Sequence, residues 1–200
     1  MGSGKSLHLL ATAHNFSDRH INYLIFKSSI DNRDGENTIH SRALGDKECI
    51  TIMPETNLYS LTNTLTNISS TQGHLIKWIL VDEAQFLTPD QVEELGAVSD
   101  NLGINVMCYG LRTDFQTNMF PGSQRLFEIA DSIEEIKSSC NCDRKTIFNA
   151  RFDTNGKVVL DGEQVEVGGD ERYIALCRKC YFTETGHYLY QKEEDFLDEE

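Results

Sequence analysis

Hydrophobic residues in the first 130 positions gather in short runs that alternate with amphipathic segments. Four compact apolar runs have the length and composition of buried strands: residues 21–27, 48–53, 77–81 and 105–109. Four other segments predict helices: the residues after Ser6, residues 54–70, the residues after Thr88, and residues 124–130. Strands that alternate with helices favour the α/β class, a parallel sheet with helices on both faces.

The helix after Thr88 carries the clearest local signal. Thr88 can cap the helix N-terminus, and Pro89 suits the first helical position. Val92, Leu95 and Val98 then recur at helical spacing, so this helix should turn one apolar face inward.

The alternation stops near Ser138, where we place a domain boundary. We expect a sheet domain over residues 1–139, interrupted by a long polar loop at 28–47. A smaller domain over 140–190 would contain short strands at 145–152 and 158–160, joined by a turn at 153–156. Residues 191–200 carry six acids against one lysine and predict a solvated acidic tail.

The chain opens with Met1-Gly2-Ser3-Gly4-Lys5-Ser6, directly before an apolar helical segment. Gly-Lys-Ser at a helix start is the second half of a phosphate-binding loop (P-loop). Its backbone N–H groups cradle phosphates, the lysine reaches the β- and γ-phosphates, and the serine hydroxyl reaches Mg²⁺. So short a motif also occurs by chance or as a linker, so a companion motif is needed.

The companion is the apolar strand at 77–81, which ends in Asp82 and Glu83. In this class of fold the first acid holds Mg²⁺, usually through water, and the second lies near the γ-phosphate as a possible general base. Exposed acids at a strand end are common in any protein. A lysine and an acid pair separated by alternating strands and helices nevertheless favour a nucleotide site.

Four cysteines form a third pattern: Cys140, Cys142, Cys177 and Cys180. Two close pairs can supply the four thiolates of a tetrahedral, structural zinc site. Unliganded buried thiols are the alternative, and disulfides are disfavoured in a reducing compartment. Cys49 and Cys108 are expected in the core, and His187 at the surface.

Acidic residues outnumber basic ones 32 to 18, which gives a formal net charge of −14. Such a surface repels a phosphodiester backbone, so we expect no nucleic-acid partner. No apolar run is long enough to span a membrane, and no charged-then-apolar leader precedes the glycine-rich start. We therefore expect a cytoplasmic protein without a membrane partner.

Together these motifs resemble the zinc-containing (type II) thymidine kinases, in their bacterial branch. Five segments carry the resemblance in the right order: residues 1–6, Asp82-Glu-Ala-Gln-Phe86, Tyr109-Gly-Leu-Arg-Thr-Asp-Phe115, Val167-Gly-Gly169 and Cys177-Arg-Lys-Cys-Tyr181. The resemblance implies a RecA-like P-loop sheet with a small C-terminal zinc-ribbon or lasso domain. It also implies structural zinc, Mg-ATP and a homotetramer.

The implied reaction transfers the γ-phosphoryl group of ATP to the 5′-hydroxyl of thymidine, giving dTMP. Matched position by position, Glu83 would be the catalytic base. ATP and Mg²⁺ would be bound by Met1, Gly2, Ser3, Gly4, Lys5, Ser6, Asp31, Arg33, Asp82 and Gln85. Thymidine would be bound by Leu111, Phe115, Val165, Glu166, Val167, Gly168 and Tyr173.

Family members carry a strand before the loop, whereas this chain begins inside the loop. We expect a start codon assigned one methionine too late; the alternative is a truncated, catalytically impaired P-loop protein. Two other hypotheses are a nucleotide-binding regulator and a zinc-ribbon nucleic-acid binder. The presence of both Glu83 and Phe115 favours the enzyme, and the net charge of −14 disfavours the nucleic-acid binder.

Overall fold

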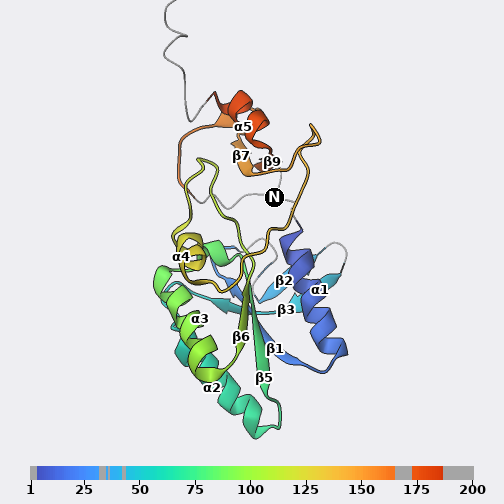
Figure 1. Cartoon of the computed structure of the whole chain (residues 1–200), viewed down its shortest axis with the longest axis vertical. Helices are drawn as coiled ribbons and strands as arrows, with labels where there is room; N and C mark the ends of the chain where they lie inside the picture. Colours follow the sequence, from blue (N-terminus) through green and yellow to red (C-terminus); the bar gives the residue numbers. More distant parts are fainter. Residues whose placement is uncertain (1–3, 32–34, 36, 42–43, 165–172, 187–200) are drawn as a thin grey trace, which may run out of the picture.

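A four-stranded parallel sheet forms the centre of the larger unit (Figure 1). The structure is a computed structural model that describes residues 4–31, 35, 37–41, 44–164 and 173–186. The sheet has the order β4-β1-β5-β6, with bounds Ile50–Ile52, Asn22–Ser28, Ile76–Asp82 and Asn105–Cys108. Every neighbouring pair is parallel, which confirms the predicted α/β class.

Helices cover both faces of this sheet (Figure 1). Helix α1 (Lys5–Asp18) lies on one face, and α2 (Leu58–Thr71) and α3 (Pro89–Leu102) lie on the other. Within β5, Leu80 packs into the core that contains Leu9 of α1, whereas Ile79 and Val81 pack into the core that contains Val92 of α3. Because successive strand residues point to opposite faces, β5 is apolar throughout and buried on both sides.

The N-terminus of α3 confirms the predicted cap. The Thr88 hydroxyl accepts a hydrogen bond from the Gln91 backbone N–H, and the Gln91 side-chain oxygen accepts one from the Thr88 N–H, both at 3.1 Å. The Gln91 amide nitrogen donates to the carbonyl oxygens of Met53 and Thr56. This reciprocal capping fixes where α3 begins and ties it to the turn before α2.

Two predictions in this unit need correction. The predicted loop at 28–47 contains an antiparallel pair, β2 (Thr38–Ser41) and β3 (Gly45–Glu48). These strands are short and mostly polar, so the sequence has no hydrophobic pattern that predicts them. Ile39 and Ser41 are nevertheless buried. Helix α4 (Pro121–Ile129) begins three residues before the predicted start, with Pro121 at its first position.

The smaller unit lies above the parallel sheet in Figure 1. Its antiparallel sheet has the order β8-β7-β9, with bounds Val158–Val159, Phe148–Phe152 and Tyr173–Leu176, and is followed by α5 (Arg178–Thr185). The strand predicted at 145–152 therefore begins later, at Phe148, and α5 was not predicted. The turn at 153–156 is confirmed by a 3.1 Å hydrogen bond from the Gly156 N–H to the Asp153 carbonyl oxygen.

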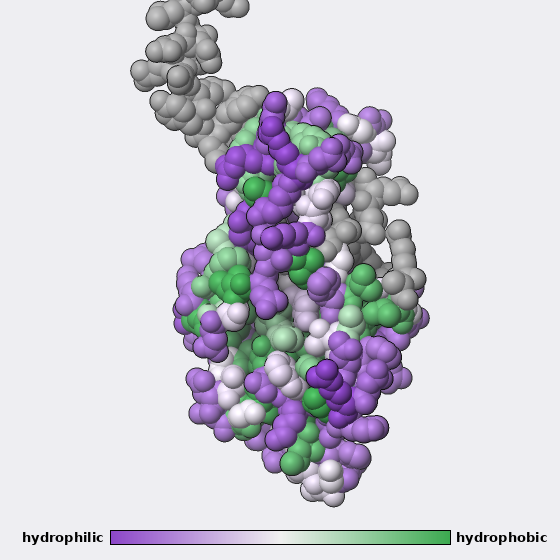
Figure 2. All heavy atoms as spheres, turned by 45° about the vertical axis from the view of Figure 1, so that its right-hand side comes forward, coloured by the Kyte–Doolittle hydropathy of each residue, from purple (hydrophilic) through white to green (hydrophobic). Residues whose placement is uncertain are grey.

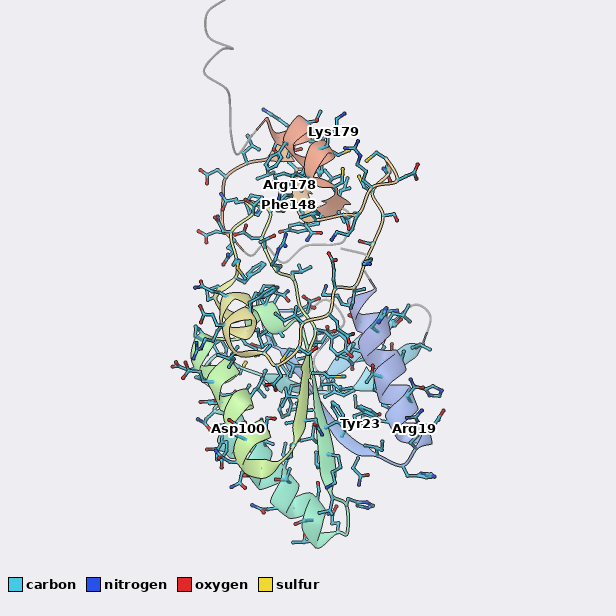
Figure 3. The ribbon with its side chains drawn as sticks, in the orientation of Figure 1. Arg19, Tyr23, Asp100, Phe148, Arg178 and Lys179 are labelled. Atoms are coloured by element: carbon cyan, nitrogen blue, oxygen red, sulfur yellow. The ribbon has the colours of Figure 1, made fainter. Side chains whose placement is uncertain are left out.

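Aromatic residues hold this smaller unit together. Phe148 packs against Tyr181 and Phe182, with ring centroids 4.9 and 5.9 Å apart. The guanidinium of Arg178 lies 5.5 Å from the centroid of the Phe148 ring, and the two side chains are labelled in Figure 3. This core fixes β7 against α5.

Hydrophilic residues cover most of the face seen in Figure 2, and hydrophobic residues appear there in separate patches. None of the helices that the structure describes is long and apolar enough to cross a membrane.

Candidate active site

The glycine-lysine-serine motif forms the turn that starts α1. Gly4 adopts a left-handed conformation (φ 76°) and precedes the first helical residue, Lys5. Its carbonyl oxygen accepts a hydrogen bond from the His8 N–H at 2.9 Å. Glycine takes this backbone conformation without the steric cost that a Cβ atom brings. From Gly4 onward, the motif thus forms the start of a helix, as the sequence predicts.

The two motifs predicted to work together meet at the end of β5. The Ser6 hydroxyl donates to a carboxylate oxygen of Asp82 at 3.0 Å. The ammonium nitrogen of Lys5 lies 3.6 Å from a carboxylate oxygen of Glu83. Lys5, Asp82 and Glu83 are all buried. Residues far apart in the chain therefore form one polar site at the carboxyl edge of the sheet.

Backbone geometry directs Glu83 away from the strand that precedes it. Asp82 is the last residue of β5, and Glu83 then adopts a left-handed conformation (φ 49°, ψ 41°) before the short 3-10 helix η1 (Ala84–Phe86). The Ala84 N–H donates to the carbonyl oxygen of Tyr109 at 2.9 Å, which anchors the turn. A non-glycine residue in this conformation costs about 1 kcal/mol or more, and such strain gathers at functional sites.

Two carboxylates lie close together in this site, and the pKa of one of them is shifted. Burial, followed by repulsion from Glu83, raises the pKa of Asp82 to about 6, although Lys5 and the Ser6 hydroxyl oppose the shift. Both carboxylates lie near Lys5. A hydroxyl and a carboxylate oxygen side by side fit the oxygen ligands that Mg²⁺ prefers. Ser6 and Asp82 are the residues that could hold this ion.

Gln85 connects Glu83 to the segment after β6. Its side-chain amide nitrogen donates a short hydrogen bond to the Glu83 carboxylate. Its amide oxygen accepts from the Leu111 N–H at 3.0 Å. The sequence grouped Gln85 with the ATP-binding residues, which stays a prediction. The bridge between Glu83 and Leu111 carried no sequence signal, because it depends on how the chain folds back.

Phe115, predicted to contact thymidine, lies where the two units meet. Its carbonyl oxygen accepts a short hydrogen bond from the Tyr181 hydroxyl of α5. The Arg151 guanidinium stacks over its ring at 4.9 Å from the centroid. Arg151 also pairs with Tyr173 in the ladder between β7 and β9. Tyr173 is another residue of the predicted thymidine site. Two of the predicted nucleoside residues, Phe115 and Tyr173, thus both neighbour Arg151.

The remaining predicted residues divide into two groups. Asp31 is buried, and its N–H donates to the carbonyl oxygen of Ser28 at the end of β1. The others lie outside the described residues: Met1, Gly2, Ser3, Arg33, Val165, Glu166, Val167 and Gly168. Their assignments to ATP or thymidine stay predictions.

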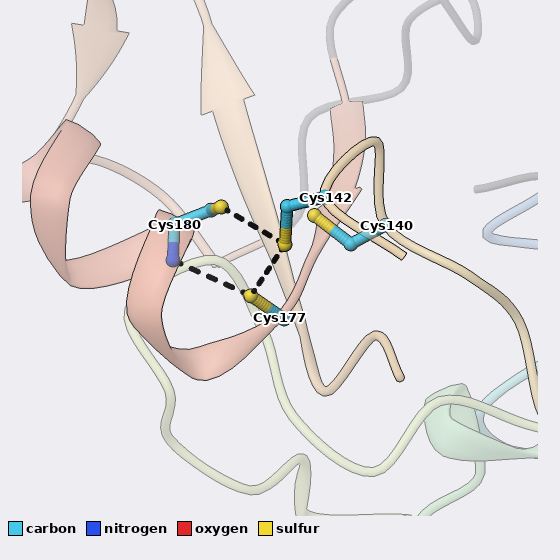
Figure 4. A group of neighbouring side chains, drawn as sticks. All are labelled: Cys140, Cys142, Cys177 and Cys180. Carbon is cyan, nitrogen blue, oxygen red and sulfur yellow. Dashed lines mark hydrogen bonds between the residues drawn. The ribbon is translucent and has the colours of Figure 1, made fainter. Parts of the chain in front are cut away.

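The four cysteines predicted as metal ligands come together beside α5 (Figure 4). Their sulfur atoms all lie within 4.8 Å of one another, and Cys142 Sγ is 3.5 Å from the sulfurs of Cys177 and Cys180. Four thiolates at the usual Zn–S distance of about 2.3 Å are about 3.8 Å apart, so the cluster fits tetrahedral zinc.

Local hydrogen bonds favour a thiolate in this cluster. Backbone hydrogen bonds from Cys142 and Cys177 lower the pKa of Cys140 to about 6. By contrast, hydrogen bonds with Cys142 and Cys177 raise the pKa of Cys180 to about 12. A bound cation would favour deprotonation of all four thiols. Outside this cluster, Cys49 is buried and Cys108 packs against the α2–α3 core, as expected.

A glycine-lysine-serine turn that meets an acid pair at the carboxyl edge of a parallel sheet places the chain among the P-loop nucleotide-binding proteins. Comparison with known families narrows this class, because the model of the thymidine kinase family matches residues 1–181. The chain belongs to the thymidine kinase family.

Named relatives agree with this membership. The chain is 43% identical over 186 residues to a thymidine kinase of Mannheimia succiniciproducens, with 93% of both chains covered. It is 42% identical over 197 residues to a thymidine kinase of Rhodopirellula baltica, covering 98% of this chain and 89% of the relative. It is also 43% identical over 179 residues to a thymidine kinase of Rhizobium meliloti, covering 90% of each.

Proposed function

We propose that this protein catalyses the ATP-dependent phosphorylation of thymidine at its 5′-hydroxyl, giving dTMP. Family membership supports the reaction, and one structural observation supports the site that performs it. Lys5 and Ser6 of the phosphate-binding turn directly face the Glu83 and Asp82 carboxylates. Phosphoryl transfer needs this combination of a phosphate cradle, a metal-binding acid and a base.

Glu83 is the proposed base. Its buried carboxylate lies at the end of β5, within 3.6 Å of Lys5. The carboxylate would accept the proton of the 5′-hydroxyl as the oxygen attacks the γ-phosphorus, and Lys5 would bind the phosphate oxygens. Ser6 and Asp82 would hold Mg²⁺, which when bound offsets the negative charge of the phosphates.

Leu111, Phe115 and Tyr173 are the proposed thymidine contacts among the described residues. Phe115 is buried and held in position by Tyr181 and Arg151, and an aromatic ring at a fixed position suits contact with a planar base. The cysteine cluster would hold a structural zinc ion, which when bound fixes α5 and therefore Tyr181.

Three further parts of the proposal concern the whole protein. We place a nucleotide-binding domain at 1–139, a zinc and nucleoside domain at 140–190 and an acidic tail at 191–200. The six cysteines, all of them described by the structure, form no disulfide, which suits the cytoplasm, where thiols stay reduced. A homotetramer is proposed from the resemblance, and light scattering would measure its mass.

The test compares the intact protein with its Glu83→Gln variant. We expect the intact protein to form dTMP from ATP and thymidine, with far less product from deoxycytidine or deoxyguanosine. Glu83→Gln should lower kcat at least about 100-fold, because general-base catalysis contributes about 10²–10⁴. Its dissociation constant for ATP should stay within about threefold, measured by calorimetry. Glu55→Gln, at an exposed turn, removes the same charge as a control.

Two outcomes would contradict the proposal at different points. If the folded protein binds ATP but does not phosphorylate thymidine, the proposed kinase function is wrong. If Glu83→Gln has the same kcat as Glu55→Gln, the proposed function stands, but Glu83 is not the catalytic base.

A further inference from the structure

We propose that Gln85 is a positioning residue that holds the Glu83 carboxylate and the Leu111 main chain in one fixed arrangement. The inference rests on the proposed roles of Glu83 as base and Leu111 as a nucleoside contact. Gln85 is 1% exposed, although its side chain is polar. Its amide group donates to one of these residues and accepts from the other.

A side-chain amide meets both demands at this position, because it carries a donor and an acceptor. The Glu83 carboxylate needs a donor, and the Leu111 N–H needs an acceptor, which is 3.0 Å away. Glutamate at position 85 would keep the acceptor and place a second carboxylate against Glu83. Methionine, of similar length, would supply neither hydrogen bond. Leaving a buried polar group without its hydrogen-bond partner is unfavourable, so the bridge constrains both of its ends.

Glycines on both sides leave the η1 turn little room to shift. A Cβ atom at Gly110 would lie 3.0 Å from the Gln85 side-chain oxygen and 3.1 Å from its backbone nitrogen. One at Gly122 would lie 2.4 Å from the Leu87 carbonyl oxygen and 3.0 Å from that of Ala84. Such close backbone approach fixes Gln85, and Gln85 in turn fixes Glu83.

Lys5 explains why Glu83 needs this restraint. The two charged groups lie 3.6 Å apart, so their attraction draws the carboxylate toward the phosphate-binding turn. The Gln85 amide holds the other carboxylate oxygen, Oε2, in place. Without that bond, Glu83 would rotate toward Lys5 and away from the hydroxyl that it must deprotonate.

Ser123 provides a matched control, because it binds the same residue on its other side. The Ser123 hydroxyl of α4 donates to the Leu111 carbonyl oxygen at 2.6 Å. Gln85 therefore acts on Leu111 and Glu83, whereas this bond of Ser123 acts on Leu111 alone. Comparing a variant without the Gln85 side chain with a variant without the Ser123 side chain therefore distinguishes an effect on Leu111, the proposed nucleoside contact, from an effect on Glu83, the proposed base.

The experiment measures kcat and thymidine KM for the wild type and for Gln85→Glu, Gln85→Met and Ser123→Ala. Gln85→Glu should lower kcat at least tenfold with thymidine KM within about threefold, because it keeps the Leu111 bond. Gln85→Met should lower kcat similarly and also raise thymidine KM about 3–10-fold. Ser123→Ala should raise thymidine KM and keep kcat within about twofold.

Thermal melting and ATP affinity identify variants that are folded. A folded Gln85→Glu protein with wild-type kcat, or one that changes only KM as Ser123→Ala does, would overturn the proposal. If Gln85→Glu melts too early to assay, Gln85→Met decides: reduced kcat at unchanged ATP affinity supports the bridge, and unchanged kcat overturns it. A wild type that binds ATP but never phosphorylates thymidine would instead overturn the proposed function.

Discussion

Asp82 shows at the scale of one residue how the site departs from what stability alone would favour. Its carboxyl group is buried beside a second carboxylate, and burial together with Glu83 raises its pKa to about 6. Ionising a group in such a place is unfavourable without a compensating cation. The folded protein therefore tolerates a carboxyl group that we propose as a ligand of Mg²⁺ in phosphoryl transfer.

Replacing this charge should stabilise the magnesium-free protein at neutral pH. The pKa of Asp82 is higher in the folded protein than its model value of 3.8, so its contribution favours folding below about pH 4. That contribution is lost as pH rises through about 6. Asp82→Asn should therefore raise the free energy of unfolding by about 1–3 kcal/mol at pH 8 and by little at pH 4.

Urea unfolding in magnesium-free buffer at both pH values measures this difference. Asp100→Asn, at an exposed position of α3 labelled in Figure 3, is the control and should change neither value. Equal effects of Asp82→Asn at pH 4 and pH 8 would contradict the linkage.

Single residues were predictable where a motif sets their spacing. Lys5 and Asp82 follow from a glycine-rich turn and an apolar strand, both of which are local patterns. The bridge through Gln85 is different, because its partner Leu111 is 26 positions away along the chain. That contact exists only after β5 and β6 pair and the chain turns back over η1.

At the scale of elements, the helices and strands that could be predicted from sequence are those whose signals are local. Helix α3 was predictable because Thr88 and Pro89 mark its start locally. The pair β2–β3 was not, because its register depends on backbone hydrogen bonds between polar residues. Helix α5 was missed because its N-cap is Cys177, a residue that the sequence indicates only as a metal ligand.

Two helical glycines should respond in opposite ways to alanine. A Cβ atom at Gly122 would meet backbone oxygen at 2.4 Å, whereas one at Gly96 would contact only the end of the Ile129 side chain at 3.7 Å. Gly122→Ala should destabilise the protein by about 1–3 kcal/mol and lower kcat, because η1 must move. Gly96→Ala should stabilise it by about 0.5–1 kcal/mol through better helix propensity.

Melting temperatures and thymidine kinetics of the two variants check this contrast. If Gly122→Ala retains wild-type stability and kcat, the close approach of α4 to η1 does not restrain the site.

At the scale of the whole molecule, residues 113–116 connect the two units. Phe115 contacts Tyr181 and Arg151 of the smaller unit, and the Asp114 carboxylate accepts from the Gln164 amide at 2.9 Å. These contacts join residues 113–116 to β7, to α5 and to the segment before β9. The arrangement was not predictable, because each contact joins segments tens of residues apart.

Removing one of these bonds should affect one substrate only. Tyr181→Phe deletes the hydroxyl that binds the Phe115 carbonyl oxygen, while Lys5 and Ser6 stay in place. A lost hydrogen bond of about 1 kcal/mol corresponds to about fivefold, so thymidine KM should rise about 3–10-fold with the ATP KM unchanged.

Steady-state kinetics with each substrate varied in turn measures both constants. Tyr59→Phe removes a hydroxyl from α2 as the control. A parallel rise in both KM values would indicate general loosening instead of a specific link.

Cys180 directly precedes Tyr181, so the proposed zinc ligands and the bond to Phe115 occupy neighbouring positions in α5. If these positions couple the binding of zinc to the binding of thymidine, the two binding equilibria form a closed thermodynamic cycle. By whatever factor zinc strengthens the binding of thymidine, thymidine must strengthen the binding of zinc. The supply of nucleoside in the cell would then help to set how firmly the protein retains its metal during zinc starvation.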